Sequence, residues 1–341
     1  MTAKCKIQDI LKDRIMVLDG AMGSMLQGYK LEENDFRGDK FKDHHLPLQG
    51  NNDLLSITRP DVVQEIHEAY YEAGADFATT NSFSGTTIAQ ADYELEDAVY
   101  EINFAAAQCA RKAADKYTEL TPDQPRFVVG AMGPTNRTAS ISPDVNDPGK
   151  RLVTFDDLKN AYFGQAKALI EGGADVLMIE TVFDTLNCKS AIMAIKELED
   201  ELGHEIATMV SGTITDASGR TLTGQTVEAF HASVRHGDLL SVGLNCALGA
   251  KQMYPHISRL SGLTDYPVSA HPNAGLPNEF GEYDESAEVM APQIEEFIKN
   301  SCINIIGGCC GTTPEHIRAF KEIADQHKPR VAVSLTEVFA V

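Results

Sequence analysis

The chain has 341 residues, 43% of them hydrophobic, and a formal net charge of −21. This composition suits a globular protein with a large core, and the acidic balance argues against nucleic acid or anionic membranes as partners. No apolar run approaches the roughly 20 residues that span a bilayer, and the charged N-terminus lacks a secretory hydrophobic segment, so we expect a cytoplasmic location.

Short apolar runs rich in Val, Ile and Met recur along the chain between longer, more polar stretches. Because these runs are almost continuously hydrophobic, we expect strands that are buried on both faces of a parallel sheet. Eight runs are predicted as strands: Ile15–Asp19, Phe77–Phe83, Arg126–Gly133, Val176–Thr181, Ile206–Gly212, Leu239–Cys246, Pro267–Ala270 and Ile303–Cys310.

The stretches between the predicted strands carry apolar residues at the spacing of one helical face. Those with the clearest pattern are Pro60–Ala73, Phe155–Glu171, Asp184–Leu202, Val227–His236, Ser286–Lys299 and Pro314–His327. Thr313 followed by Pro314 is typical of a helix start. Glu72–Asp76 and Glu171–Asp175 share a glycine-containing pattern that indicates a helix stop and a turn into the next strand.

Eight alternations of strand and helix predict an α/β protein with a single (β/α)₈ TIM barrel, rather than an open sheet. We expect this barrel domain to span residues 1–328, with 329–341 as a C-terminal tail or linker remnant. The long polar region from Lys30 to Leu55 is expected to cross the mouth of the barrel as irregular chain.

Active sites of such barrels lie where the strands end. The strand-end residues of this chain are polar, acidic and rich in thiols: Asp19, Asn81, Pro134–Arg137, Glu180, Thr213, Asn245, Cys246, His271–Asn273, Cys309 and Cys310. We interpret this set as one site.

Three cysteines stand out in this set, because Cys246 closes the sixth strand while Cys309 and Cys310 close the eighth. Three thiolates with an open fourth position match a catalytic zinc site, and a zinc ion there would favour the thiolate form of a substrate thiol. Adjacent cysteines point to opposite faces of a strand, so both can bind one ion only if the glycines at 307, 308 and 311 permit a sharp turn.

Other interpretations of the cysteines remain open. The three thiols could be buried core residues, or the vicinal pair could form a disulfide, although its strained ring disfavours this. The remaining cysteines, Cys5, Cys109, Cys188 and Cys302, are expected to be small buried hydrophobic residues.

Two acidic residues, Asp19 and Glu180, end the first and fourth predicted strands. They could receive the ammonium group of an amino acid, and the amides of the turn after Asp19 could receive its carboxylate. Loop capping, or a pair of general acid and base, are the alternatives.

Seven stretches of the chain resemble the homocysteine-binding domain of cobalamin-dependent methionine synthase, within about residues 12 to 328. They are Val17–Gly23, Gly133–Asp147, Ile179–Asn187, Ser211–Thr226, Ser241–Gly249, Ser269–Asp284 and Gly307–His316. The cysteine motifs belong to homocysteine methyltransferases in general, whereas the long central motifs resemble the cobalamin-dependent branch.

The resemblance implies a zinc-dependent homocysteine S-methyltransferase that activates homocysteine as a zinc-bound thiolate and forms methionine. It implies Cys246, Cys309 and Cys310 as the ligands of one Zn²⁺, with no catalytic residue beyond that site. It also implies that Asp19 and Glu180 hold the amino group of homocysteine, and that the amides at Gly20 and Ala21 hold its carboxylate.

The resemblance further implies that methylcobalamin on a partner domain or protein supplies the methyl group. The family's full-length enzymes continue into cobalamin and folate modules. Because this sequence ends at Val341 after an unfamiliar segment, Val331–Val341, we expect those modules to act in trans or to be missing from it. The chain also departs from the family at Thr80, where the family has Glu.

The loops Asn136–Gly149 and Thr215–Gly224, with Arg137 and Arg220, are expected to form the surface on which a cobalamin-carrying partner docks. One alternative is a free methyl donor such as betaine or S-methylmethionine. A cationic donor needs an aromatic cage or an acidic lining, and the chain has no Trp and no aromatic cluster at its strand ends. Another alternative is a zinc- or thiol-binding protein without turnover.

Overall fold

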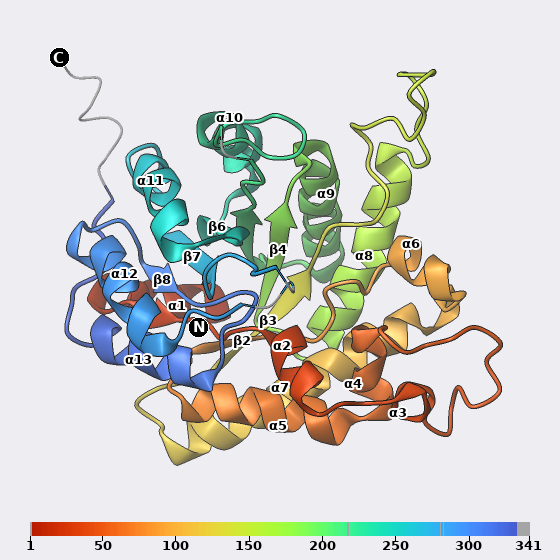
Figure 1. Ribbon diagram of the computed structural model, residues 1–341, viewed down its shortest axis with the longest axis horizontal. Coiled ribbons are helices and arrows are strands. Elements are labelled where there is room, and N and C mark those ends of the chain that lie inside the picture. The colour runs from red at the N-terminus through yellow and green to blue at the C-terminus, as the bar shows by residue number, and fades with distance from the viewer. Residues whose placement is uncertain (1, 217, 280, 282, 333–341) are drawn as a thin grey trace.

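The strands predicted from apolar runs form one parallel sheet in the computed structural model, which describes residues 2–216, 218–279, 281 and 283–332. The sheet has eight strands in the order β1-β8-β7-β6-β5-β4-β3-β2 (Figure 1). A parallel bridge between Leu18 and Phe77 joins its two edge strands. The sheet therefore closes on itself, and the predicted (β/α)₈ barrel is confirmed.

The strands are β1 Met16–Val17, β2 Phe77–Thr79, β3 Phe127–Met132, β4 Val176–Val182, β5 Ala207–Gly212, β6 Ser241–Gly249, β7 Val268–Asn273 and β8 Ile305–Ile306. Every predicted strand is present, but several limits were wrong. Strand β8 ends before Gly307 rather than at Cys310, and β2 ends at Thr79 rather than at Phe83. Strands β6 and β7 run further than predicted, to Gly249 and Asn273.

Alternation along the strands divides the core into an interior and an outer layer. In β4, Val176 and Met178 pack in the barrel interior, whereas Leu177 and Ile179 pack in the layer between strands and helices. The same alternation directs the next residue, Glu180, toward the barrel axis.

Helices cover the outside of the barrel (Figure 1). The α-helices are α1 Ala3–Asp13, α2 Met22–Gly28, α3 Glu33–Arg37, α4 Leu55–Thr58, α5 Pro60–Glu72, α6 Thr87–Gln90, α7 Val99–Leu120, α8 Phe155–Glu171, α9 Thr185–Leu202, α10 Val227–Val234, α11 Ala250–Ser261, α12 Ala287–Lys299 and α13 Pro314–Ala324. Short 3₁₀ helices are η1 Asn52–Leu54, η2 Ala91–Tyr93, η3 Glu96–Ala98 and η4 Arg235–Gly237.

The six predicted helices are present, and Thr313 caps α13 with Pro314 in its first turn, as predicted. Helices α1, α7 and α11 were not among the predicted segments. The buried face of α7 is largely alanine, which weakens its apolar pattern. Helix α11 contains Pro255, which argues against a helix interior. The region from Lys30 to Leu55 is less irregular than predicted, because it contains α3 and η1.

Helix α1 closes the barrel at the end opposite to the carboxyl ends of the strands. Its Ile7 and Leu11 belong to the same buried cluster as Met16 and Ile305, which lie inside the barrel. Nearby, Arg330 is buried, and its guanidinium donates to Ser261 and to the carbonyl of Tyr266. Across the described segments, every helix is too short or too polar for a bilayer crossing.

Candidate active site

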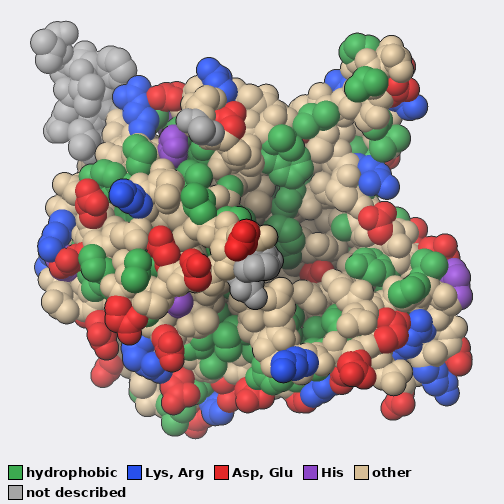
Figure 2. Space-filling view, viewed as in Figure 1, with side chains coloured by type: hydrophobic (Ala, Val, Ile, Leu, Met, Phe, Trp, Pro, Cys, Tyr) green, Lys and Arg blue, Asp and Glu red, His purple; other side chains and the backbone are tan. Residues whose placement is uncertain are grey.

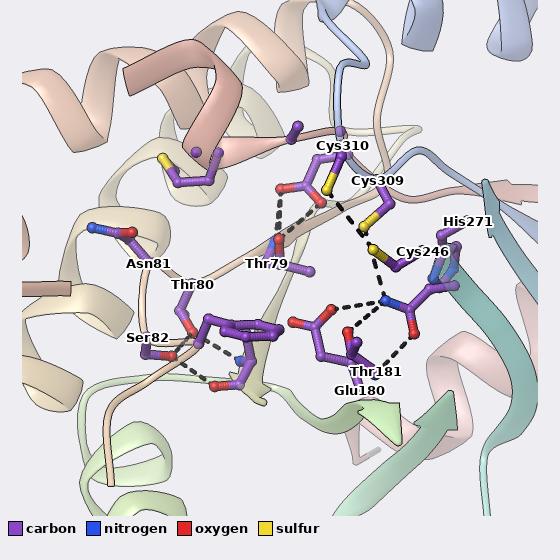
Figure 3. A pocket seen from close by; sticks show the side chains of 18 of the residues that line it. Thr79, Thr80, Asn81, Ser82, Glu180, Thr181, Cys246, His271, Cys309 and Cys310 are labelled. Atoms are coloured by element: carbon purple, nitrogen blue, oxygen red, sulfur yellow. Dashed lines mark hydrogen bonds between the residues drawn. The ribbon is translucent and has the colours of Figure 1, made fainter. Parts of the chain in front are cut away.

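A cavity of about 360 Å³ opens at the end of the barrel where the strands terminate. It brings together all the residues that were predicted to bind metal or substrate: Asp19, Gly20, Ala21, Glu180, Cys246, Cys309 and Cys310 (Figure 3). Asn81, Asn245 and His271 from the predicted set also line it, whereas Thr213 and the Pro134–Arg137 segment do not.

The three thiols converge from two parts of the chain. Cys246 lies within β6, while Cys309 and Cys310 lie in the loop that follows β8. The three Sγ atoms all lie within 4.8 Å of one another, and those of Cys246 and Cys310 are 3.8 Å apart. All three residues are half-buried. A single small cation could therefore contact all three sulfurs at once.

The backbone around the thiols departs from regular strand geometry. Gly311 has a φ of +80°, and Cys246 and Ala247 have φ values of +60° and +59°. These two residues lie in an irregularity of the β6–β7 pairing between Asn245 and Gly249. Residues other than glycine are strained in the left-handed region of backbone conformation, so packing around the site must impose it on Cys246 and Ala247.

The predicted roles of the glycines near Cys309 need one correction. Gly311 makes the turn with a positive φ, but Gly307 and Gly308 do not have positive φ values. Gly308 is needed for space instead, because a Cβ atom there would lie 2.2 Å from Oγ1 of Thr312. The two thiols therefore depend on close packing as well as on backbone freedom.

Residues that sequence reasoning did not identify hold the thiol loop in place. Thr312 Oγ1 donates to the carbonyl of Cys309 at 2.7 Å, and the amide of Gly311 donates to Ser24 Oγ at 3.0 Å. Tyr70 donates its hydroxyl to the carbonyl of Thr312 at 3.1 Å. Such tethers from α2 and α5 cannot be read from local sequence, because they join distant segments.

The proximity of the sulfurs changes their acidity. Hydrogen bonds from neighbouring thiols, that of Cys246 first, lower the pKa of Cys310. The same contacts, again with Cys246 first, raise the pKa of Cys309 well above its usual range. Among the three thiols the proximity therefore favours ionisation of Cys310, and a cation bound between the sulfurs would favour ionisation of the others.

The two predicted carboxylates lie in the wall of the same cavity. Asp19 is 1% exposed and accepts hydrogen bonds from the amide of Thr79 at 2.8 Å and from its hydroxyl at 3.1 Å. Burial raises the pKa of Asp19 well above its usual range. Burial, with a smaller effect from Cys246, raises the pKa of Glu180 to about 8. A cationic ligand would offset the cost of holding both carboxylates ionised.

Thr80, which the resemblance implied to stand where the family has Glu, takes part in a set of hydrogen bonds between the chain after β2 and strand β3. Its Oγ1 accepts from the amide of Ala131 at 2.9 Å and lies 2.6 Å from Ser82 Oγ, which donates to the carbonyl of Ala131 at 2.8 Å. These hydroxyls join the chain after β2 to β3, so Thr80 acts as part of the cavity wall.

The donor set fits a zinc ion with one open coordination position. Zinc takes thiolate ligands and commonly binds three protein ligands in a catalytic site. Among the described residues, these three cysteines are the group of His, Cys, Asp or Glu side chains close enough to share an ion. Cys109, Cys188 and Cys302 are buried elsewhere, as predicted, but Cys5 is exposed on α1, so its predicted burial was wrong.

The two loops predicted to form a docking surface follow β3 and β5 at the same end of the barrel. The first loop projects from the molecule ahead of α8 (Figures 1 and 2). Its base is held by Asn187, whose side chain accepts a hydrogen bond from the amide of Ala139 and donates one to the carbonyl of Arg137. Arg220 instead donates to the carbonyl of Gly224 within its own loop; position 217 of that loop lies outside the described residues.

Comparison with known proteins gives a family and a fold. A family model described as homocysteine S-methyltransferase matches residues 16–324. The metallated form of the homocysteine methyltransferase MmuM from Escherichia coli has a TM-score of 0.70 and 24% identity, covering 94% of this chain and 99% of that chain. The oxidised form of the same enzyme has a TM-score of 0.72 and 23% identity, with the same coverage. At this identity the structural likeness shows the shared barrel.

Proposed function

This chain belongs to the homocysteine S-methyltransferase family, and we propose that it activates the thiol of homocysteine at a zinc ion held by Cys246, Cys309 and Cys310. The observation that carries the proposal is the convergence of three sulfurs within 4.8 Å at the base of the cavity. A set of three thiolates is typical of zinc sites that bind a soft ligand, whereas hydrolytic zinc sites more often use His and carboxylates.

A zinc ion at these ligands would lower the pKa of a substrate thiol and keep the sulfur as a nucleophilic thiolate. The chain itself supplies the groups that orient the amino acid. We propose that Asp19 and Glu180 bind its ammonium group and that the amides at Gly20 and Ala21 bind its carboxylate. The amide of Ala21 would then exchange its present hydrogen bond to the carbonyl of Thr312, which is 3.3 Å long, for the carboxylate. All four residues line the same cavity as the thiols, so both ends of homocysteine would be held at once.

We further propose that the methyl group comes from methylcobalamin carried by a partner domain or protein, with folate chemistry also supplied outside this chain. The end of the barrel at which the cavity opens offers a surface for a macromolecular partner, because exposed apolar side chains lie on the loops that follow β3, β5 and β7 and in the first turn of α9. They are Ile141, Val145, Leu152, Leu186, Leu222 and Leu276. Apolar side chains gathered at the rim of a functional cavity are typical of a docking surface.

A free cationic donor such as betaine or S-methylmethionine is the second candidate. Family membership is compatible with it, and two carboxylates in the cavity could attract a cation. However, Phe83 is the single aromatic residue among the described residues that line the cavity. An aromatic cage needs several ring faces around the cation, so this lining favours the cobalamin-borne donor.

The test is to incubate the reduced, zinc-loaded protein with homocysteine and, separately, with methylcobalamin, betaine or S-methylmethionine, and to measure methionine. We expect slow methionine formation with free methylcobalamin, a faster reaction when a cobalamin-carrying protein supplies it, and no reaction with the other donors. Efficient turnover with betaine or S-methylmethionine would contradict the proposed donor but not the role of the thiols. No turnover with any donor would favour the third candidate, a zinc- or thiol-binding protein.

A further inference from the structure

Asn245 lies next to Cys246 at the end of β6, and its side chain is central to the contacts of the cavity wall. The residue is 2% exposed and lines the cavity. Its backbone pairs in register with His271 of β7, at the point where the β6–β7 pairing becomes irregular. A buried amide needs partners for its oxygen and for its two hydrogens, so its neighbours show what it holds.

The amide group clamps the end of β4. The backbone amide of Thr181 donates to Oδ1 of Asn245 at 2.9 Å, and Nδ2 of Asn245 donates to the hydroxyl of Thr181 at 2.8 Å. Thr181 has a φ of +55°, and the β4–β5 register shifts between Ile179 and Val182. The clamp therefore fixes the bulge that carries Glu180 into the cavity.

One hydrogen of Nδ2 remains after this clamp, and two acceptors compete for it. Oε2 of Glu180 lies 3.4 Å from Nδ2, and Sγ of Cys309 lies 3.9 Å from it. The dashed lines that end on Glu180, Thr181 and Cys309 in Figure 3 show how these contacts converge. The amide thus stands between a residue proposed to bind the substrate and a residue proposed to bind the metal.

We propose that Asn245 is a positioning residue that couples binding of the substrate's ammonium group to the thiol cluster; this inference rests on the proposed function. When an ammonium group engages Glu180, that carboxylate becomes a weaker acceptor, and the N–H of Asn245 that the clamp does not use donates more fully to the sulfur of Cys309. A hydrogen bond to a thiolate draws electron density from the sulfur, so Cys309 becomes a weaker donor to the metal. A zinc ion held by these three cysteines would then bind the substrate thiol more strongly.

The two roles of Asn245, clamp and coupler, can be separated by choice of variant. Asn245→Ala removes every contact of the amide, and Asn245→Asp keeps the acceptor for the Thr181 amide but loses the N–H donors. Thr181→Ala is the matched control, because it removes part of the clamp and leaves both hydrogens of Asn245. Circular dichroism and thermal unfolding check that each variant is folded.

The measurement is the thiolate-to-cobalt charge-transfer band of the Co²⁺-substituted protein, together with homocysteine affinity by calorimetry. A hydrogen bond to a thiolate stabilises its lone pairs and moves this band to shorter wavelength. We expect both Asn245 variants to move the band to longer wavelength and to lose homocysteine affinity at least tenfold, with metal content unchanged. Thr181→Ala should leave the position of the band unchanged.

A double-mutant cycle gives the sharper result. Glu180→Gln weakens the competing acceptor, so we expect it to move the band to shorter wavelength when Asn245 is present and to have no effect on the band in Asn245→Ala. An equal shift in both backgrounds, or no shift in either Asn245 variant, would overturn the coupling while metal and homocysteine binding by the unmodified protein stand. Failure of the unmodified protein to bind metal would overturn the coupling and the proposed function together.

Discussion

The surroundings of the cysteines decide how acidic each thiol is. Burial raises the pKa of Cys109 to about 11 and also raises the pKa of Cys188, so these thiols stay protonated and inert. The thiols at the cavity differ because their neighbours are other thiols, which lower the pKa of Cys310. Metal binding should therefore depend on the clustered cysteines alone.

This gives a first prediction. The reduced protein should bind about one zinc ion per chain, and Cys309→Ala should lose it because one of three sulfur ligands is gone. Cys5→Ala is the control, since Cys5 is exposed on α1. Metal content after gel filtration, by elemental analysis, distinguishes the variants. Zinc retained by Cys309→Ala and by Cys310→Ala would mean that the ion is held elsewhere.

The second prediction concerns Asp19, which is buried and whose carboxylate is held in position by hydrogen bonds from Thr79. Asp19→Asn retains an acceptor for the Thr79 amide but removes the charge that would pair with a buried ammonium. Leaving that ammonium unpaired should weaken homocysteine binding roughly tenfold to a thousandfold, with zinc content intact. Calorimetric titration with homocysteine measures this, and unchanged affinity in both Asp19→Asn and Glu180→Gln would move substrate recognition to other residues.

At the scale of elements, the shared pattern of Glu72–Asp76 and Glu171–Asp175 corresponds to a repeated structural unit. Gly74 and Gly173 have φ values of +104° and +108° and end their helices. The aspartate two residues after each glycine accepts a hydrogen bond from the amide of the second residue of the preceding strand: Asp76 from Val17 in β1, and Asp175 from Val128 in β3, both at 2.8 Å. The short sequence echo thus predicts a real repeat of the βα units.

A third prediction compares these two aspartates. Asp76 is fully buried and accepts two hydrogen bonds from Arg14, whereas Asp175 is partly exposed and its partner Arg111 also pairs with Asp115. Asp76→Asn should lower the free energy of unfolding by about 3 kcal/mol, because it removes the carboxylate that faces both Arg14 and the buried Arg126. Asp175→Asn should cost about 1 kcal/mol or less. Urea unfolding measures both, and equal losses would show that burial does not decide the difference.

Strand limits were the least accurate part of the sequence prediction, and the reason lies in backbone geometry. An apolar run indicates where a strand is buried, but not where its ladder stops. Strand β8 ends before Gly307 because the chain turns there to bring Cys309 and Cys310 into the cavity. Strand β6 continues through a bulge at Cys246 and Ala247, whose left-handed backbone no local pattern predicts.

At the scale of the whole molecule, the loops at the strand ends make a broad rim around the thiol cavity. Figure 2 shows a hollow on this face, beside the projecting loop that precedes α8. The most exposed apolar residue of that loop is Val145, at 97%. Because it packs against little of its own chain, a substitution there should leave the fold unchanged.

The fourth prediction follows from this rim. Val145→Asp should slow methyl transfer from a cobalamin-carrying protein severalfold, because a charge would be buried on docking, while homocysteine affinity and the thermal unfolding midpoint stay unchanged. Arg137→Ala should also slow methyl transfer from the cobalamin-carrying protein. Arg137 lies 3.6 Å from Asp92 at the base of that loop, so its loss removes an ion pair that helps to place the loop. Rates with free methylcobalamin serve as the control. An equal effect on free and protein-borne donor would argue against a docking role for the loop.

The sequence by itself determined the barrel and named the thiols and carboxylates that meet in the cavity. Eight apolar runs in alternation with helical periodicity favour a closed parallel sheet. The rule that the active site of a barrel lies at the strand ends then included Asp19, Glu180 and the three cysteines, but it also included Thr213 and the Pro134–Arg137 segment, which do not line the cavity. These inferences depend on local patterns, so one sequence is enough for them.

Only the tertiary structure decided how the site is held. The left-handed Cys246, the tether from Ser24 to Gly311, and the amide of Asn245 between Glu180 and Cys309 all join segments that are distant in sequence. No local pattern encodes such contacts, because each partner is placed by the packing of a different βα unit. The sequence therefore names the groups that are proposed to carry the chemistry, and the closed barrel sets the distances between them.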